Sequence, residues 1–116
     1  MVKLVLEREA LLETFENDVQ LLAEIIRVFL EDTPGRLANL RAAVIGRDSN
    51  QIANGSHSLR GSLSMFGAKA AVEAVQRLEY MGRQREVEFV DEAFSAFERE
   101  MSLVTSALDL ISNNTF

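Results

Sequence analysis

The chain contains a single histidine, His57, in the segment Ser56-His57-Ser58-Leu59-Arg60-Gly61-Ser62. A neutral imidazole is a good nucleophile near neutral pH. The arginine and the glycine that follow share one helical face with it, and a guanidinium presents forked donors that suit phosphoryl oxygens. This combination predicts a histidine that carries a phosphoryl group.

The position of His57 relative to the core separates a functional histidine from a structural one. At about 100° per residue, the apolar residues of this helix form one stripe: Ile52, Leu59, Leu63 and Phe66. His57 lies about 150° from the centre of that stripe, on a face with Ala53, Arg60, Gly61 and Ser64. The sequence therefore predicts His57 off the core, and the alternative reading is an incidental surface histidine.

Gly61 favours the functional reading. A glycine inside a helix costs about 1 kcal/mol relative to alanine, and no packing offsets this cost on an exposed face. A glycine one turn beyond His57 would leave the imidazole open to a bulky partner. Gly55 points nearer the apolar stripe, where close helix packing explains it, and Arg60 taken alone would be a solvated arginine.

The following helix offers partners for the ring. Gln76, Glu79 and Arg83 lie along one flank of its apolar stripe, which is formed by Ala71, Val75 and Leu78. A group that accepts from Nδ1–H would orient the ring and leave Nε2 free for attack. Glu79 and Arg83 also have the spacing of an exposed ion pair, which is the alternative role for both.

The composition indicates one helical domain over residues 1–116, with 47% hydrophobic and 26% charged residues. The net charge of −6 argues against nucleic acid and an anionic membrane surface as partners. There is no cysteine, no apolar run long enough to span a bilayer and no signal peptide, so we expect a cytoplasmic protein.

Apolar spacings of three and four predict an all-α fold, an antiparallel up-down four-helix bundle with a short additional N-terminal helix packed at one end. The expected helices cover about Glu7–Phe15, Asp18 to Gly46, Asp48–Phe66, Ala68–Arg83 and Val87–Ile111. Thr33-Pro34 is expected to interrupt the second, or to begin a new helix as cap and first residue. Its inward residues are Leu21, Leu22, Ile25, Ile26, Phe29, Leu30, Leu37, Leu40, Val44 and Ile45. Asp48 with Gln51 resembles a capping box, and Val2, Leu4 and Leu6 suggest an extended segment before the first helix.

Three segments resemble the histidine-containing phosphotransfer (HPt) domains of two-component phosphorelays. The family's motif of histidine, any residue, leucine, lysine, glycine and serine stands here as His57-Ser58-Leu59-Arg60-Gly61-Ser62, followed by Gly67-Ala68. Leu78-Glu79-Tyr80-Met81-Gly82-Arg83 is similar to a second family segment, and Phe29-Leu30-Glu31-Asp32-Thr33-Pro34 to its second helix. The similarity covers nearly the whole chain.

The resemblance implies that His57 is phosphorylated at Nε2, that Arg60 (usually lysine) stabilises phosphoryl charge, and that Glu79 accepts from Nδ1–H. Gly61 would provide access, while Arg83, Ser64 and Gln76 are possible contacts of the phosphoryl group or partner. Docking would use the short first helix, with Leu12 and Phe15 as candidates. The implied partners are receiver domains and a hybrid sensor kinase, and the protein would be a bacterial monomer.

The sequence has no phosphate-binding loop for ATP, so we expect no kinase activity of its own. No cofactor or metal is expected. Two other classes remain open: a noncatalytic helical adaptor that binds a partner protein, and a carboxylate-bridged metal bundle. The metal bundle needs Glu-x-x-His pairs, whereas Asn54 stands three residues before His57 and no second histidine exists.

Overall fold

The computed structural model describes residues 6–115, with side chains through residue 113. This part of the chain is entirely helical, which confirms the all-α prediction: α1 (Arg8–Thr14), α2 (Val19–Ile45), α3 (Ser49–Met65), α4 (Lys69–Arg83) and α5 (Val90–Thr115). Of the extended segment expected at Val2, Leu4 and Leu6, the first two residues lie outside the described residues, and Leu6 is buried in the core. None of the described helices is long and apolar enough to cross a membrane.

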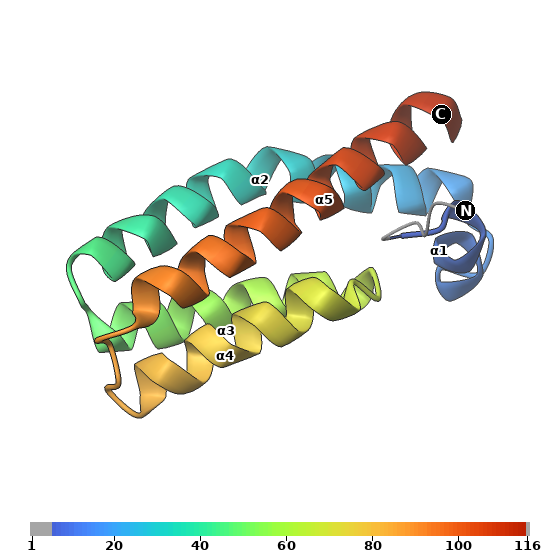
Figure 1. Cartoon of the computed structure of the whole chain (residues 1–116). Helices are drawn as coiled ribbons and strands as arrows, with labels where there is room; N and C mark the ends of the chain where they lie inside the picture. The colour runs from blue at the N-terminus through green and yellow to red at the C-terminus, as the bar shows by residue number, and fades with distance from the viewer. Residues whose placement is uncertain (1–5, 116) are drawn as a thin grey trace.

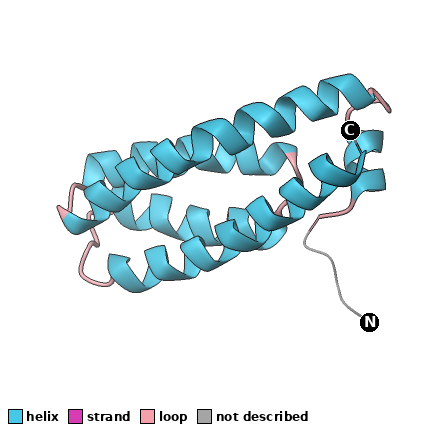
Figure 2. Ribbon diagram, turned by 90° about the horizontal axis from the view of Figure 1, so that it is seen from above, coloured by secondary structure: helices cyan, strands magenta, loops and turns pink. Residues whose placement is uncertain are grey.

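The long helices lie side by side around one core. α3 packs against α2 and α4, and α5 packs against the same two helices from the other side (Figure 1). The short helix α1 lies at the end of the molecule where α2 begins and α5 ends (Figure 1). Seen from above, short loops join the helices (Figure 2), with the α2–α3 and α3–α4 connections at 46–48 and 66–68.

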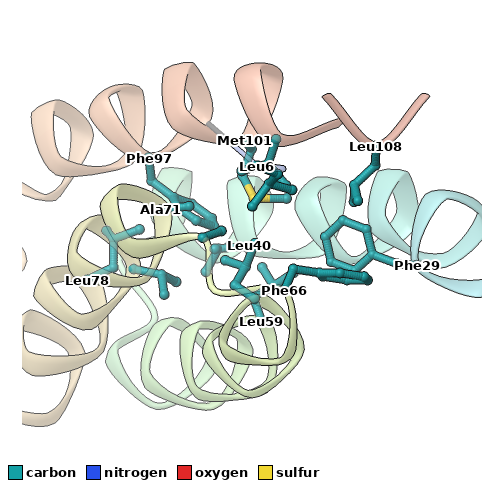
Figure 3. Close-up of a cluster of buried hydrophobic side chains, with 14 of the residues drawn as sticks. Leu6, Phe29, Leu40, Leu59, Phe66, Ala71, Leu78, Phe97, Met101 and Leu108 are labelled. Carbon is teal, nitrogen blue, oxygen red and sulfur yellow. The ribbon is translucent and has the colours of Figure 1, made fainter. Parts of the chain in front are cut away.

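The predicted stripe of α3 is the core face of that helix. Ile52, Leu59 and Leu63 are fully buried, and the Phe66 ring packs edge-on against Phe29 of α2 with ring centroids 5.1 Å apart. Side chains from α2, α4 and α5 complete the same cluster, among them Leu40, Ala71, Leu78, Phe97 and Met101 (Figure 3). This core fixes the rotation of α3 and therefore the direction in which His57 points.

The expected interruption at Thr33-Pro34 is wrong, because α2 runs through it without a break. Proline removes the amide that would bond to the Leu30 carbonyl, at a cost of about 3 kcal/mol in a helix interior. The buried residues on both sides of Pro34 continue a single face, from Leu22 to Val44, and burial of each large one contributes about 1.5–3 kcal/mol. The Thr33 hydroxyl donates to the Phe29 carbonyl at 2.6 Å. Packing along the whole helix thus outweighs the local break.

Several details of the elements differ from the sequence expectation. Leu21 and Ile45, expected inward, are 45% and 72% exposed, because each lies beside the buried face of α2. α5 begins at Val90 rather than Val87. In the connection from α4, Arg85 has a φ of 58°, which is not a helical conformation. Asp48 does cap α3, since its carboxylate accepts from the Gln51 amide at 3.1 Å.

α4 comes close to the backbone of α3 at Gly82. A Cβ at this position would lie 2.7 Å from the Ala53 nitrogen and 2.9 Å from the Ser49 carbonyl oxygen. Both are backbone atoms, so neither can swing away. Ala53, expected on the histidine face, is instead buried in this contact. Gly82 therefore sets how near α4 comes to α3.

We expect Gly82→Ala to lower the free energy of unfolding by about 1–3 kcal/mol, because the helices must separate to admit the methyl group. Gly35→Ala is the matched control: it also lies inside a helix, and its added Cβ would meet nothing within 4 Å. That control should raise the unfolding free energy by about 0.5–1 kcal/mol through helix propensity. Urea unfolding followed by circular dichroism measures both, and equal effects of the two substitutions would contradict the close contact.

Candidate functional site

The candidate site joins His57 on α3 to Glu79 on α4. The ring nitrogen Nδ1 lies 2.9 Å from Glu79 Oε2. The imidazole side chain is 60% exposed and the glutamate side chain 10% exposed. His57 points away from the core, as predicted, while the buried residues Val75 and Leu78 rotate α4 so that Glu79 faces α3.

Two arginines complete a cluster around the Glu79 carboxylate. Arg60 Nε donates to Oε1 at 2.7 Å, and Arg83 Nη2 donates to Oε2 at 2.8 Å. Burial by itself raises the pKa of Glu79, but the hydrogen bonds from Arg83, His57 and Arg60 outweigh it and hold that pKa below its usual value. The carboxylate is therefore ionised at neutral pH.

The contacts at Nδ1 determine the tautomer of a neutral His57 ring. Both described contacts of the ring are at this atom: Glu79 Oε2 at 2.9 Å and Arg60 Nη2 at 3.0 Å. A carboxylate only accepts and a guanidinium only donates, so the two contacts require opposite protonation of Nδ1. The ionised carboxylate forms the stronger, charge-assisted bond. We therefore assign the proton to Nδ1, which leaves the lone pair on Nε2.

The other predicted site residues lie outside this cluster. Ser64 is exposed and its hydroxyl donates to the Arg60 carbonyl of its own helix at 2.8 Å, and Gln76 is exposed on α4. On α1, Leu12 is 8% exposed and belongs to the core, so it has little surface to offer a partner. Phe15 is half-buried and packs against the same core.

Gly61 borders the cluster on the open side, where an added Cβ would meet nothing within 4 Å. Packing does not offset the free energy that a glycine costs the helix at this position, as the sequence predicted. Apart from its two chain neighbours, no side chain comes within 4 Å of the position that a Cβ at Gly61 would occupy.

We expect Gly61→Ala to separate stability from activity. The free energy of unfolding should rise by about 0.5–1 kcal/mol, while phosphorylation of His57, which the sequence predicts, should slow by about tenfold because the methyl group narrows the approach to the ring. Thermal unfolding and single-turnover labelling measure the two effects. Faster or unchanged labelling would show that Gly61 does not serve access.

Three features of this region were not predicted. Arg36 of α2 reaches across to α3, where Nη2 donates to Ser58 Oγ at 2.8 Å and Nη1 to Ser62 Oγ at 3.1 Å. Ser56 is fully buried and its hydroxyl has no partner among the described residues. The third feature is the close approach of α4 to α3 at Gly82. Its only indication in the sequence was that Gly82 lies in the Leu78–Arg83 motif.

No group of three or more histidine, cysteine, aspartate or glutamate side chains is placed to hold a metal ion within residues 6–115. In a comparison with protein families, the model of the Hpt domain family matches residues 24–110. No curated protein and no solved structure matches the chain. The aligned range contains the whole of α3 and α4 and therefore the entire cluster around Glu79.

Proposed function

The chain belongs to the Hpt domain family, and on that premise we propose that His57 is its phosphoryl-carrying residue. The family is one of histidine phosphotransfer domains, phosphocarriers of two-component phosphorelays rather than kinases. The 2.9 Å contact between His57 Nδ1 and Glu79 is the observation that carries the assignment. With the proton on Nδ1, the lone pair lies on Nε2 of the chain's single histidine, whose side chain is 60% exposed.

The donor in this proposal is an aspartyl phosphate on a receiver domain. The Nε2 lone pair attacks phosphorus, a P–N bond forms, and the P–O bond to the aspartate breaks, so that the aspartate leaves as a carboxylate. The proton stays on Nδ1, and the imidazole therefore becomes cationic as the bond forms. The Glu79 carboxylate compensates this charge where it develops, which lowers the barrier.

The two arginines would act on the phosphoryl group itself. Arg60 and Arg83 each use part of their guanidinium on Glu79, and a guanidinium has five N–H donors in all. The remaining donors can bind phosphoryl oxygens while the contact to Glu79 holds each head group in place. Arginine at position 60 thus combines the role of a cation with that of a support for Glu79.

We also propose the direction of phosphoryl transfer, the partner proteins and the organisation of the domain. A second receiver would take the phosphoryl group from His57, since the transfer is reversible, and a hybrid sensor kinase would lie upstream. The domain would span residues 1–116 as a monomer in the cytoplasm. Its long helices would run up and down in antiparallel order, and the short connections at 46–48 and 66–68 support this arrangement.

The test is transfer of ³²P from a labelled receiver to the purified protein. We expect a label that is lost in acid and kept in alkali, as for a phosphoramidate, and that a second unlabelled receiver removes. Receivers from the source organism form the panel. Absence of label with every receiver would contradict the proposal and favour the noncatalytic adaptor.

A further inference from the structure

Arg36 differs from the other arginines whose side-chain hydrogen bonds are described. Arg27, Arg41, Arg47, Arg60 and Arg83 all bond to carboxylates. Arg36 bonds only to the hydroxyls of Ser58 and Ser62 within the described part of the chain. Its positive charge is therefore uncompensated by these bonds, in a chain whose net charge is −6.

The position of the guanidinium relates it to His57. At about 100° per residue, Ser58 and Ser62 lie about 100° and 140° to one side of His57 on α3, whereas Arg60 lies about 60° to the other side. Gly61 falls between them, about 40° from His57. The open surface over Gly61 thus has Arg60 on the side of α4 and Arg36 on the side of α2.

The bonds that hold Arg36 are of a kind that an anion can replace. A serine hydroxyl accepts from the guanidinium but carries no charge, whereas a carboxylate accepts the same bonds, neutralises the charge and can take both N–H groups of the fork at once. The two serines hold the fork beside α3 without neutralising it. An incoming carboxylate can therefore take over either N–H group at a net gain.

The surface next to Arg36 is open and mostly apolar, although two acidic residues of α2, Glu24 and Asp32, also line it. Arg36 and Ser62 line a groove of about 280 Å³ between α2 and α3. Val28 and Met65, which also line it, are 42% and 46% exposed. A protein that covered this groove would remove water from around Arg36, and an ion pair in such a place is less screened than one on an open surface.

We propose that Arg36 is a specificity-determining residue that binds a carboxylate of the receiver domain, on the flank of His57 opposite Arg60. The inference rests on the proposed function, in which a receiver brings its aspartyl phosphate to His57. A receiver suits this cation because the side chain that carries its phosphoryl group is an aspartate, which leaves as a carboxylate on transfer. Arg36 acts on association, whereas Arg60 and Arg83 act on the phosphoryl group.

The experiment compares Arg36→Gln with Arg99→Gln, an equal change of charge at an exposed position of α5, a helix that packs mainly against α2 and α4. Initial rates of transfer from a phosphorylated receiver are measured over a range of receiver concentrations. We expect Arg36→Gln to raise KM about tenfold with kcat within about twofold of the wild type, and Arg99→Gln to change neither. The KM difference should shrink to about twofold at 0.5 M salt, since salt screens the pair.

Two further variants examine the geometry. Arg36→Lys keeps the charge without the fork and should raise KM by about threefold. The double variant Ser58→Ala, Ser62→Ala keeps Arg36 but removes the two hydroxyls that hold its guanidinium. We expect its KM to rise about twofold to threefold, with a melting temperature within a few degrees of the wild type. Equal KM values for Arg36→Gln and Arg99→Gln would overturn the proposal, and so would a lower kcat at unchanged KM.

Phosphoramidate separates this inference from the proposed function. It transfers its phosphoryl group to Nε2 and releases ammonia, and it has no protein surface to dock. We expect it to label wild type and Arg36→Gln at equal rates; slower labelling of the variant would place Arg36 at the phosphoryl group and refute a docking role. No label on the wild-type protein from either donor would refute the function of His57 and this inference with it.

Discussion

Replacing His57 with glutamine is expected to reduce labelling by a phosphorylated receiver to background, a loss of at least about 1000-fold, because no nucleophile remains at the site. The chain has no second histidine that could accept the group in its place. Glutamine matches the length of the ring and can still reach Glu79, but its amide nitrogen has no lone pair available for attack. The measurement is the acid-labile, alkali-stable ³²P on the protein after gel separation.

A change of fold must be excluded as the cause. The His57 side chain is 60% exposed, so we expect the melting temperature of His57→Gln to stay within a few degrees of the wild type. Ser102→Gln, an exposed substitution on α5, serves as the control and should label normally. Label that persists in a folded His57→Gln protein would show that another residue carries the phosphoryl group.

The second large effect is expected for Glu79→Gln, which should lower the free energy of unfolding by about 1–3 kcal/mol at pH 7. Its carboxylate accepts from three cationic or polar groups while its side chain is only 10% exposed. Glutamine keeps an acceptor oxygen but not the charge that Arg60 and Arg83 require. Transfer should also slow by about tenfold, because the cationic ring loses its counter-charge.

This loss of stability should depend on pH in a definite direction. The pKa of Glu79 is lowered on folding: burial raises it, and the hydrogen bonds from Arg83, His57 and Arg60 lower it further than burial raises it. The stabilisation is therefore complete above the unfolded pKa of about 4.5 and is lost as the pH falls through the folded value. The difference between wild type and Glu79→Gln should be constant from pH 7 to about pH 5 and shrink below that.

Urea unfolding between pH 3 and 7 measures this difference. Glu73→Gln provides the control, since Glu73 is an exposed carboxylate on the same helix, and its effect should stay within about 0.5 kcal/mol. A difference for Glu79→Gln that grew on acidification would mean that burial dominates and that the pKa is raised rather than lowered.

Much of the site could be predicted from helical spacing. The apolar stripe of α3 placed His57 on the surface, and the stripe of α4 placed Glu79 and Arg83 on a common flank. These inferences need only the helical period and the sign of the charges. They succeeded because a residue's direction on a helix follows from its sequence position once the buried face is known.

The residues that were missed depend on distances between helices. Gly82 looks like any helical glycine until the Ala53 backbone is placed 2.7 Å from its absent Cβ. Arg36 is one of twelve basic residues, and its contact with Ser58 depends on how α2 crosses α3. Arg60 was expected near the phosphoryl group, whereas its bond to Glu79 appears only when α4 is in place. Pro34 was mispredicted for a similar reason, because packing along α2 outweighs the tendency of proline to end a helix.

The short connection between α3 and α4 also bears on the order in which the protein folds. His57 and Glu79 are 22 positions apart in the chain, and only residues 66–68 separate their helices. The entropy lost in closing so short a loop is small, and contacts of low contact order form early in folding. The hairpin of α3 and α4 is therefore suited to nucleate the bundle, with α2 and α5 condensing on it afterwards. His57 and Glu79 would then meet in the transition state for folding, before α2 and α5 have packed.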